Sequence, residues 1–142
     1  MPDIEHSIEI AAKLQTVYPL VSTANGFARW WAMDTTERDG TVELGFFNRT
    51  TVYRLQLVAD RPPLEAEWLC GTGDEWNGTR LRFRLEETKS GTLLRFIHAD
   101  WRARSNYFVS CTTTWGALMF RLKAAAEGQT PGPLFLADSM AY

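Results

Sequence analysis

His98 is the residue of this chain whose type and neighbours best suit proton transfer or ligand recognition. Polar and apolar residues alternate along the expected strand that contains His98. Of the two ways in which this strand can face the core, the favoured one places His98 on the same face as Leu94 and Phe96. An imidazole among apolar side chains can hydrogen-bond a polar group of a ligand or act as a general base. The competing interpretation is a core histidine that donates to a backbone carbonyl or to the hydroxyl of Thr112 or Thr114.

The other residues able to bind a metal or act as nucleophiles are scattered along the chain. His6 lies on the apolar face of the first expected strand, where a structural role is favoured. Cys70 and Cys111 fall on expected inward faces and are predicted to be buried and reduced rather than disulfide-bonded. No short spacing of metal ligands and no nucleophile motif occurs, and no helix is expected to follow the glycine-rich loop at 71–78. The sequence therefore predicts no metal, no cofactor and no catalytic residue, and it predicts that this loop makes a turn at a cavity mouth.

An arginine stripe, Arg80, Arg82 and Arg84, resembles an anion-binding patch at first sight. Glu65 and Glu67 alternate on the preceding expected strand, so cross-strand ion pairs on a solvated face explain the stripe. The net charge of -2 and the pI near 5.7 give no overall attraction to polyphosphate. Nucleic acid is therefore not an expected partner.

Aromatic residues make up 13% of the chain, with six tryptophans, and they are candidates for the wall of an apolar cavity. Ordinary core packing is the alternative use of the same rings. A cavity of this kind would favour a flat or aliphatic ligand, oriented by polar groups such as His98, Tyr53 and Thr114. The predicted ligand-binding residues are Trp30, Trp31, Tyr53, Trp68, Phe83, Phe96, His98, Cys111, Trp115 and Leu118.

A long C-terminal helix, residues 105–127, is the element around which the chain must be organised. Its apolar residues recur at spacings of three and four and form one stripe, and Gly128 is well placed to end the helix. Such a stripe needs a large apolar surface to pack against. The stripe comprises Phe108, Cys111, Trp115, Leu118, Leu122 and Ala125.

The preceding residues supply that surface as strands of an antiparallel sheet. The expected order is a strand at 4–11, a short helix at 12–23 limited by Pro19, a second short helix at 24–31, and strands at 41–47, 51–59, 64–70, 76–87 and 92–101. A tight turn at 88–91 joins the last two strands. Register is ambiguous only in the last strand, where the alternative would turn Leu93, Ile97 and Trp101 inward. The fold class is therefore α+β, with a curved sheet around the helix and a pocket between them.

The length of 142 residues predicts a single domain, with a core at 4–128 and a tail at 129–142. The tail is rich in Gly and Pro and then apolar, so we expect an extended segment docked on a surface. It either closes the pocket or packs on a second subunit. No apolar run is long enough to span a membrane and no leader pattern is present, which predicts a cytoplasmic protein without a membrane partner.

Five local strings, in this order along the chain, resemble a known family. They are IEIAAKLQTVYPLVST, GFARWW, LEAEW, FRLEETKSGTLLRFIH and TTTWGALMFRLKAAAEG. Together with the element order they resemble the helix-grip fold of the START-like, or SRPBCC, superfamily, and within it the homologues of the heat-shock-chaperone ATPase activator. The resemblance covers residues 4–128. The chain departs from it after His98, where family members often have Gly, and Trp101 is expected to plug or reshape one end of the pocket.

The resemblance implies a domain that binds an apolar small molecule or a partner protein, and it implies no defined reaction. The leading hypothesis is non-catalytic binding of a hydrophobic ligand between sheet and helix. The alternatives are a chaperone-interacting protein and an enzyme of the polyketide cyclase or hydratase kind, with His98 and either Tyr53 or Asp100 as acid and base. A homodimer is a further hypothesis.

Overall fold

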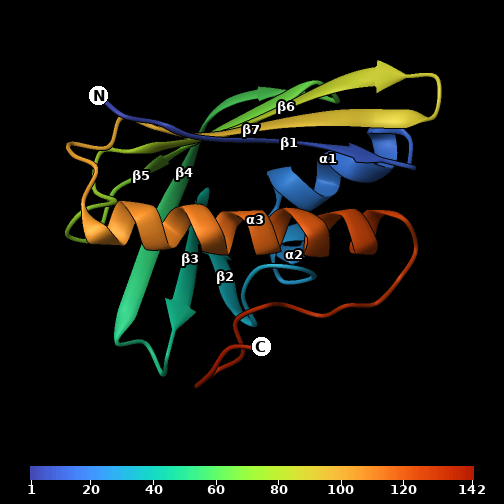
Figure 1. Cartoon of the computed structure of the whole chain (residues 1–142). Helices are drawn as coiled ribbons and strands as arrows, with labels where there is room; N and C mark the ends of the chain where they lie inside the picture. Colours follow the sequence, from blue (N-terminus) through green and yellow to red (C-terminus); the bar gives the residue numbers. More distant parts are fainter.

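A computed structural model describes all residues from Met1 to Tyr142. One antiparallel sheet and three helices make up the fold, and the long helix α3 crosses the concave side of the sheet (Figure 1). The elements are β1 (Ile4–Ile10), α1 (Leu14–Ser22), α2 (Ala24–Phe27), β2 (Asp34–Arg38), β3 (Thr41–Phe46), β4 (Thr51–Arg61), β5 (Glu65–Cys70), β6 (Arg80–Thr88), β7 (Gly91–Ala99) and α3 (Asn106–Ala126). The predicted α+β helix-grip architecture is confirmed.

The sheet is a meander from β2 to β7, with β1 added beside β7. Its strand order is β1-β7-β6-β5-β4-β3-β2, and every pairing is antiparallel. In β7 the residues Leu94, Phe96 and His98 are buried, which confirms the register favoured from the sequence. A one-residue shift would have turned these side chains to solvent.

Strand β2 is an element that the sequence did not predict. Its residues, DTTER, carry no apolar side chain, so no hydrophobic alternation marks them as a strand. The strand lies at the sheet edge, pairs only with β3 and is largely exposed, and charged side chains are common at such edges. Helix α2 is also shorter than expected. It ends at Phe27, and turns carry the chain on through Trp30 and Trp31.

Helix α3 confirms the predicted long helix and its apolar stripe, since all six predicted stripe residues are buried. Ser105 caps the N-terminus by accepting a hydrogen bond from the backbone N–H of Phe108. The helix lies against β1 along one sheet edge, where the His6 Nε2 atom is 3.2 Å from the Thr112 carbonyl oxygen. At the C-terminal end of the helix, Lys123 Nζ donates to the Glu9 carbonyl.

The tail after α3 docks on the protein, as expected, and runs below the helix back toward β2 and β3 (Figure 1). The Leu134 and Phe135 amides donate to the carbonyls of Trp30 and Trp31, and the Met33 amide donates back to Phe135. The tail therefore forms a short extension beside the turn that follows α2. Two tail residues, Phe135 and Met140, line the pocket, so the tail forms part of its wall.

The outer face of the sheet carries the expected ion pairs. Arg80 and Arg82 both pair with Glu67, and Arg84 pairs with Glu65. The arginine stripe is therefore part of a cross-strand ladder on the face opposite α3. Both cysteines are buried and free, and none of the helices combines the length and apolarity needed to cross a membrane.

Candidate functional site

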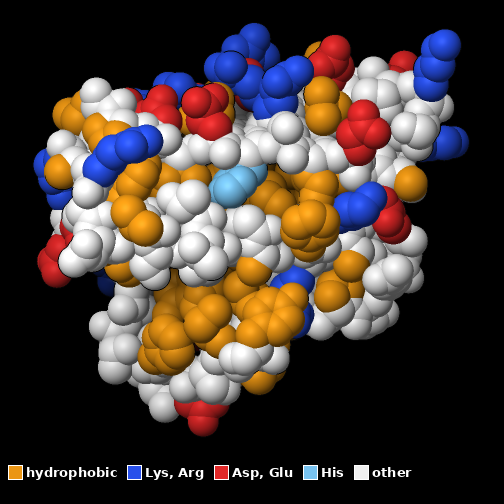
Figure 2. Space-filling model, in the orientation of Figure 1, with side chains coloured by type: hydrophobic (Ala, Val, Ile, Leu, Met, Phe, Trp, Pro, Cys, Tyr) orange, Lys and Arg blue, Asp and Glu red, His pale blue; other side chains and the backbone are white.

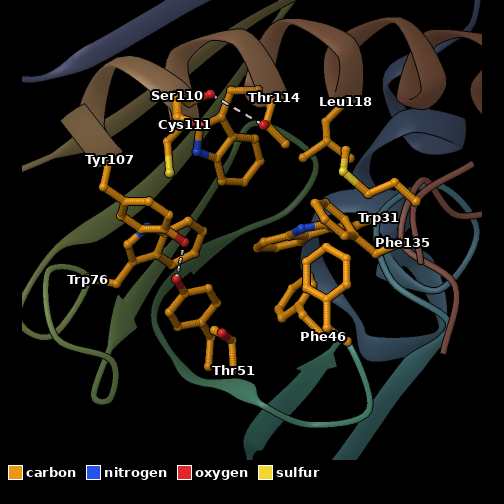
Figure 3. Close-up of a pocket in the computed structure, with 14 residues that line it drawn as sticks. Trp31, Phe46, Thr51, Trp76, Tyr107, Ser110, Cys111, Thr114, Leu118 and Phe135 are labelled. Atoms are coloured by element: carbon orange, nitrogen blue, oxygen red, sulfur yellow. Dashed lines mark hydrogen bonds between the residues drawn. The ribbon is translucent and has the colours of Figure 1, made fainter. Parts of the chain in front are cut away.

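A cavity of about 280 Å³ lies between α3, the β3–β4 hairpin and the C-terminal tail. Eight of the fourteen residues that line it are aromatic, and none is charged. Figure 3 shows Tyr107, Trp76 and Thr51 on one side of the cavity, and Trp31, Phe46, Leu118 and Phe135 on the other. The lining residues are Trp31, Phe46, Phe47, Thr51, Tyr53, Trp76, Tyr107, Ser110, Cys111, Thr114, Trp115, Leu118, Phe135 and Met140.

The cavity forms because α3 packs closely against the sheet at its β1 edge but not at the opposite end, where the β3–β4 hairpin lies. At the β1 edge, Gly116 leaves room for the His6 ring, and an added Cβ there would lie 3.8 Å from His6 Cε1. At the other side, the β3–β4 hairpin extends away from the helix (Figure 1). Hydrophobic side chains gather on the surface below α3, between the helix and this hairpin (Figure 2). The space between α3 and the hairpin is wedge-shaped, and the large aromatic rings that line it fill it only in part.

Four aromatic residues, stacked or tilted against one another, form the inner wall. The rings of Trp31 and Trp115 are 5.0 Å apart, and those of Trp76 and Trp115 are 6.0 Å apart and nearly parallel. Tyr53 stacks on Trp76 at 3.9 Å with an interplanar angle of 6°. These contacts hold the rings in one arrangement, so the wall is formed before any ligand enters.

His98 fixes the orientation of Trp115 from behind this wall. The Trp115 indole N–H donates to His98 Nδ1 at 3.1 Å, so that nitrogen carries no proton. His98 Nε2–H therefore donates to Thr79 Oγ1 at 2.9 Å, and the Thr79 hydroxyl donates to the Trp76 carbonyl. Burial lowers the pKa of His98 to about 3, which keeps the imidazole neutral. His98 is thus a core histidine that donates to a hydroxyl, as the competing interpretation had it, but the hydroxyl is that of Thr79 and not of Thr112 or Thr114, which donate to carbonyls of their own helix.

A pair of tyrosine hydroxyls marks one end of the cavity. The Tyr53 and Tyr107 oxygens lie 2.5 Å apart, and Tyr107 comes from the first turn of α3. Burial is the main cause that raises the pKa of Tyr53, and it also raises the pKa of Tyr107 to about 12. Both hydroxyls are therefore protonated and neutral at physiological pH.

Trp76 and Cys111 lie at the same end of the cavity. The Trp76 indole N–H is buried and makes no hydrogen bond of normal geometry. Its polar neighbour is the Cys111 thiol, which is a weak acceptor. Burial raises the pKa of Cys111, although the donors of Trp76 and Tyr107 beside the thiol act in the opposite direction. The thiol is therefore an unreactive wall group rather than a nucleophile.

The predicted ligand-binding residues divide into two groups. Trp31, Tyr53, Cys111, Trp115 and Leu118 line the cavity. The other five lie in the core and do not line it: Trp30, Trp68, Phe83, Phe96 and His98.

Trp30 and Trp68 have a structural role. The sequence pattern could not distinguish this role from lining the cavity. The Trp30 indole donates to the Leu20 carbonyl, and the Trp68 indole donates to the Val21 carbonyl. Both bonds tie the end of α1 to the core. Trp101, expected to plug one end of the pocket, instead packs behind the wall, with its ring 6.4 Å from Trp76 and 5.2 Å from Phe108.

Sequence reasoning did not select eight of the lining residues. They are Phe46, Phe47, Thr51, Trp76, Tyr107, Ser110, Phe135 and Met140. Helical spacing could have found Tyr107, because it precedes Cys111 by four positions and Leu118 by eleven on one face of α3. No periodic pattern marks the tail residues Phe135 and Met140, because their position at the cavity depends on the path of an extended segment.

An antiparallel sheet that wraps a long C-terminal helix and encloses an apolar cavity defines the helix-grip class of proteins. No protein-family model and no curated protein matches the chain. Solved structures do match. The solution structure of an Aha1 dimer from Colwellia psychrerythraea is 26% identical, with a TM-score of 0.81, and the match covers 90% of this chain and 98% of that one.

Two further matches show the fold alone. A protein of Mesorhizobium loti is 13% identical, with a TM-score of 0.74 over 86% of this chain and 94% of its own. A protein of Bacillus halodurans is 20% identical, with a TM-score of 0.71 over 89% of this chain and 98% of its own. The resemblance to homologues of the chaperone ATPase activator, and the helix-grip fold itself, are therefore confirmed.

Proposed function

We propose that this protein binds a hydrophobic small molecule in the cavity below α3. The observation that carries the proposal is an aromatic cavity of about 280 Å³ without a charged lining residue. Pockets for small molecules are usually apolar, already formed and equipped with a few polar groups. A dry cavity of about 150 Å³ can hold benzene, so this one suits a compound of about two fused rings.

The proposal can be tested with the uncharged fluorescent probe N-phenyl-1-naphthylamine. We expect saturable binding, with a rise in probe emission and quenching of tryptophan emission, because Trp31, Trp76 and Trp115 lie in the cavity wall. The two adjacent residues Thr113 and Thr114 provide a matched pair of variants. Thr114 lines the cavity, whereas Thr113 is exposed on the outer side of α3.

Thr114→Trp should fill the cavity and reduce probe affinity at least tenfold, while Thr113→Trp should bind the probe as the wild type does. Thermal unfolding of both variants shows whether each is folded. No saturable probe binding by the wild type, or equal affinity in the two folded variants, would contradict the proposal.

A chaperone-interacting role is the second candidate, and the 26% identity to an Aha1 structure favours it. The test is whether the purified chain stimulates the ATPase of a heat-shock chaperone and co-sediments with it. The absence of both effects would exclude this role. It would leave ligand binding unaffected, because the cavity residues are not required for a surface contact.

The same Aha1 structure is a dimer, and a homodimer is the partner that we propose for this chain. The outer side of α3 supports this proposal. No charged residue occurs between Asn106 and Phe120, and Val109 and Phe120 are 61% and 67% exposed. Sedimentation velocity at several concentrations would decide, since a monomer at all concentrations contradicts a dimer.

The geometry does not favour the enzyme hypothesis. His98 was the suggested acid or base, but both its ring nitrogens are hydrogen-bonded within the protein and it lies outside the cavity lining. A general base must reach the proton that it removes. Asp100 does not line the cavity either, which leaves Tyr53 as the only one of the three suggested groups at the site.

A further inference from the structure

The end of the cavity beside Tyr107 differs chemically from the rest. Phe46, Leu118 and Phe135 on the opposite side offer only apolar surface to a ligand (Figure 3). The near end holds the Tyr53–Tyr107 hydroxyl pair, whose two oxygens lie 2.5 Å apart. A ligand that fills the cavity would therefore meet the paired phenolic hydroxyls at this end, in addition to the hydroxyl-bearing residues Thr51, Ser110 and Thr114 of the lining.

Counting the protons of this pair shows that one O–H has no oxygen or nitrogen acceptor within the protein. Two hydroxyls carry two O–H groups, and the bond between Tyr53 and Tyr107 uses one of them. Neither oxygen hydrogen-bonds to another oxygen or nitrogen of the protein, and the Cys111 thiol beside Tyr107 is only a weak acceptor. The second O–H is therefore available to an acceptor placed in the cavity, and either tyrosine can supply it because either can be the donor within the pair.

Trp76 provides an independent indication of an acceptor at this end. Its side chain is 4% exposed and lines the cavity, yet its indole N–H has no oxygen or nitrogen partner and lies beside only the weakly accepting Cys111 thiol. Buried N–H groups are nearly always paired. An unpaired donor next to the free tyrosine O–H indicates that this end of the cavity suits an oxygen acceptor.

The lining also limits the charge that a ligand can carry. No Lys, Arg or His lines the cavity, so a carboxylate or phosphate would be buried without a counter-ion. Burial raises the pKa of Tyr53, Tyr107 and Cys111, which reflects the same poor stabilisation of negative charge. A ketone, by contrast, accepts a hydrogen bond without carrying charge.

We infer that the Tyr53–Tyr107 pair is the polar subsite of the cavity, and that it selects uncharged, flat, largely apolar ligands bearing one oxygen acceptor. This inference rests on the proposed function and specifies its ligand class. The aromatic wall holds the flat body, and the free tyrosine O–H binds the oxygen.

Three naphthalene probes of similar shape test the inference by isothermal titration calorimetry. They are 2-acetylnaphthalene, which carries the ketone, 2-isopropylnaphthalene, which replaces it with a hydrocarbon group, and 2-naphthoate, which replaces it with an anion. We expect the ketone to bind about fivefold more tightly than the hydrocarbon because of one added hydrogen bond. The anion should bind at least tenfold more weakly than the ketone.

Phenylalanine variants then locate the donor. Tyr53→Phe and Tyr107→Phe each remove one hydroxyl and release the other from the pair, so each single variant should keep the ketone preference. Only the double variant removes both tyrosine donors, and it should lose most of the ketone preference, with at most the part that the Trp76 indole N–H supplies remaining. Tyr142→Phe is the control, because Tyr142 is exposed and lies outside the cavity lining.

The outcomes separate this inference from the proposed function. Equal binding of ketone and hydrocarbon by the wild type, or an undiminished ketone preference in the folded double variant, would overturn the subsite while leaving the cavity as a binding site. Tighter binding of the anion would overturn the ligand class. Failure of all three probes to bind would overturn the proposed function, and this inference with it.

Discussion

Lowering the pH from 7 to 5 should destabilise this protein through a single buried side chain, His98. Burial lowers the pKa of His98 from 6.5 to about 3 in the folded protein. In the unfolded chain the imidazole is solvated and titrates near its ordinary pKa. Between these two values the unfolded state binds a proton that the folded state does not. The stability from neutral His98 is therefore complete above pH 6.5 and is lost as the pH falls toward 3.

The size of the effect follows from the proton linkage. At full slope, each pH unit below the unfolded pKa removes about 1.4 kcal/mol of unfolding free energy. Between pH 7 and pH 5 the expected loss is therefore about 2 kcal/mol. Domains are typically stable by only about 5 to 15 kcal/mol, so urea unfolding can measure this loss with confidence.

The chosen pH range separates His98 from the carboxylates. Arginine partners lower the pKa values of Glu43 and Glu67, and Lys123 lowers that of Glu127, all from an ordinary value of 4.5. Because a lowered carboxylate pKa affects stability only near and below the unfolded value, these groups contribute mainly below pH 5.

The assay is urea unfolding at pH 7, 6 and 5, followed by tryptophan fluorescence. His98→Gln keeps a side-chain carbonyl and an amide but cannot titrate, so its stability should change little over this range. His6→Gln is the matched control and should retain the loss seen in the wild type. In addition, the NMR shift of the His98 Cε1 proton should not titrate between pH 7 and pH 5. The same pH slope in wild type and His98→Gln, or titration of that proton, would refute the reasoning.

Two further substitutions test the packing of α2 on α1 and the docking of the tail. Gly26→Ala should lower the unfolding free energy by about 3 kcal/mol, because an added Cβ would lie 2.1 Å from a backbone oxygen of α1. Gly71→Ala is the control, because a Cβ added at Gly71 has no atom within 4 Å and should leave the unfolding free energy nearly unchanged. Similar urea midpoints for the two variants would show that the close approach of Gly26 to α1 does not limit stability. Arg121→Met should release the tail at 129–142, because Arg121 Nη1 donates to two of its carbonyls at 2.9 and 2.8 Å. Limited proteolysis should then cleave the tail faster than in the exposed-site control Arg95→Met, and equal cleavage rates would show that Arg121 does not hold the tail.

Local periodicity made much of the fold predictable. The stripe on α3 and the alternation in β6 and β7 repeat at the periods of a helix and a strand, so the buried faces could be identified without tertiary information. The same alternation placed His98 inward and paired the arginine stripe with Glu65 and Glu67. β2 was missed because its pairing with β3 depends on position at the sheet edge and not on an apolar pattern.

The sequence by itself determined the buried faces of the long helix and of the regular strands, but only the tertiary structure decided which buried rings face a void. Trp30 and Trp31 are adjacent and equally buried, yet Trp31 lines the cavity and Trp30 donates to the Leu20 carbonyl. The difference arises from the wedge between α3 and the β3–β4 hairpin, and from a tail that returns to close it. Both depend on contacts between residues far apart in the chain, and a local pattern does not encode such contacts.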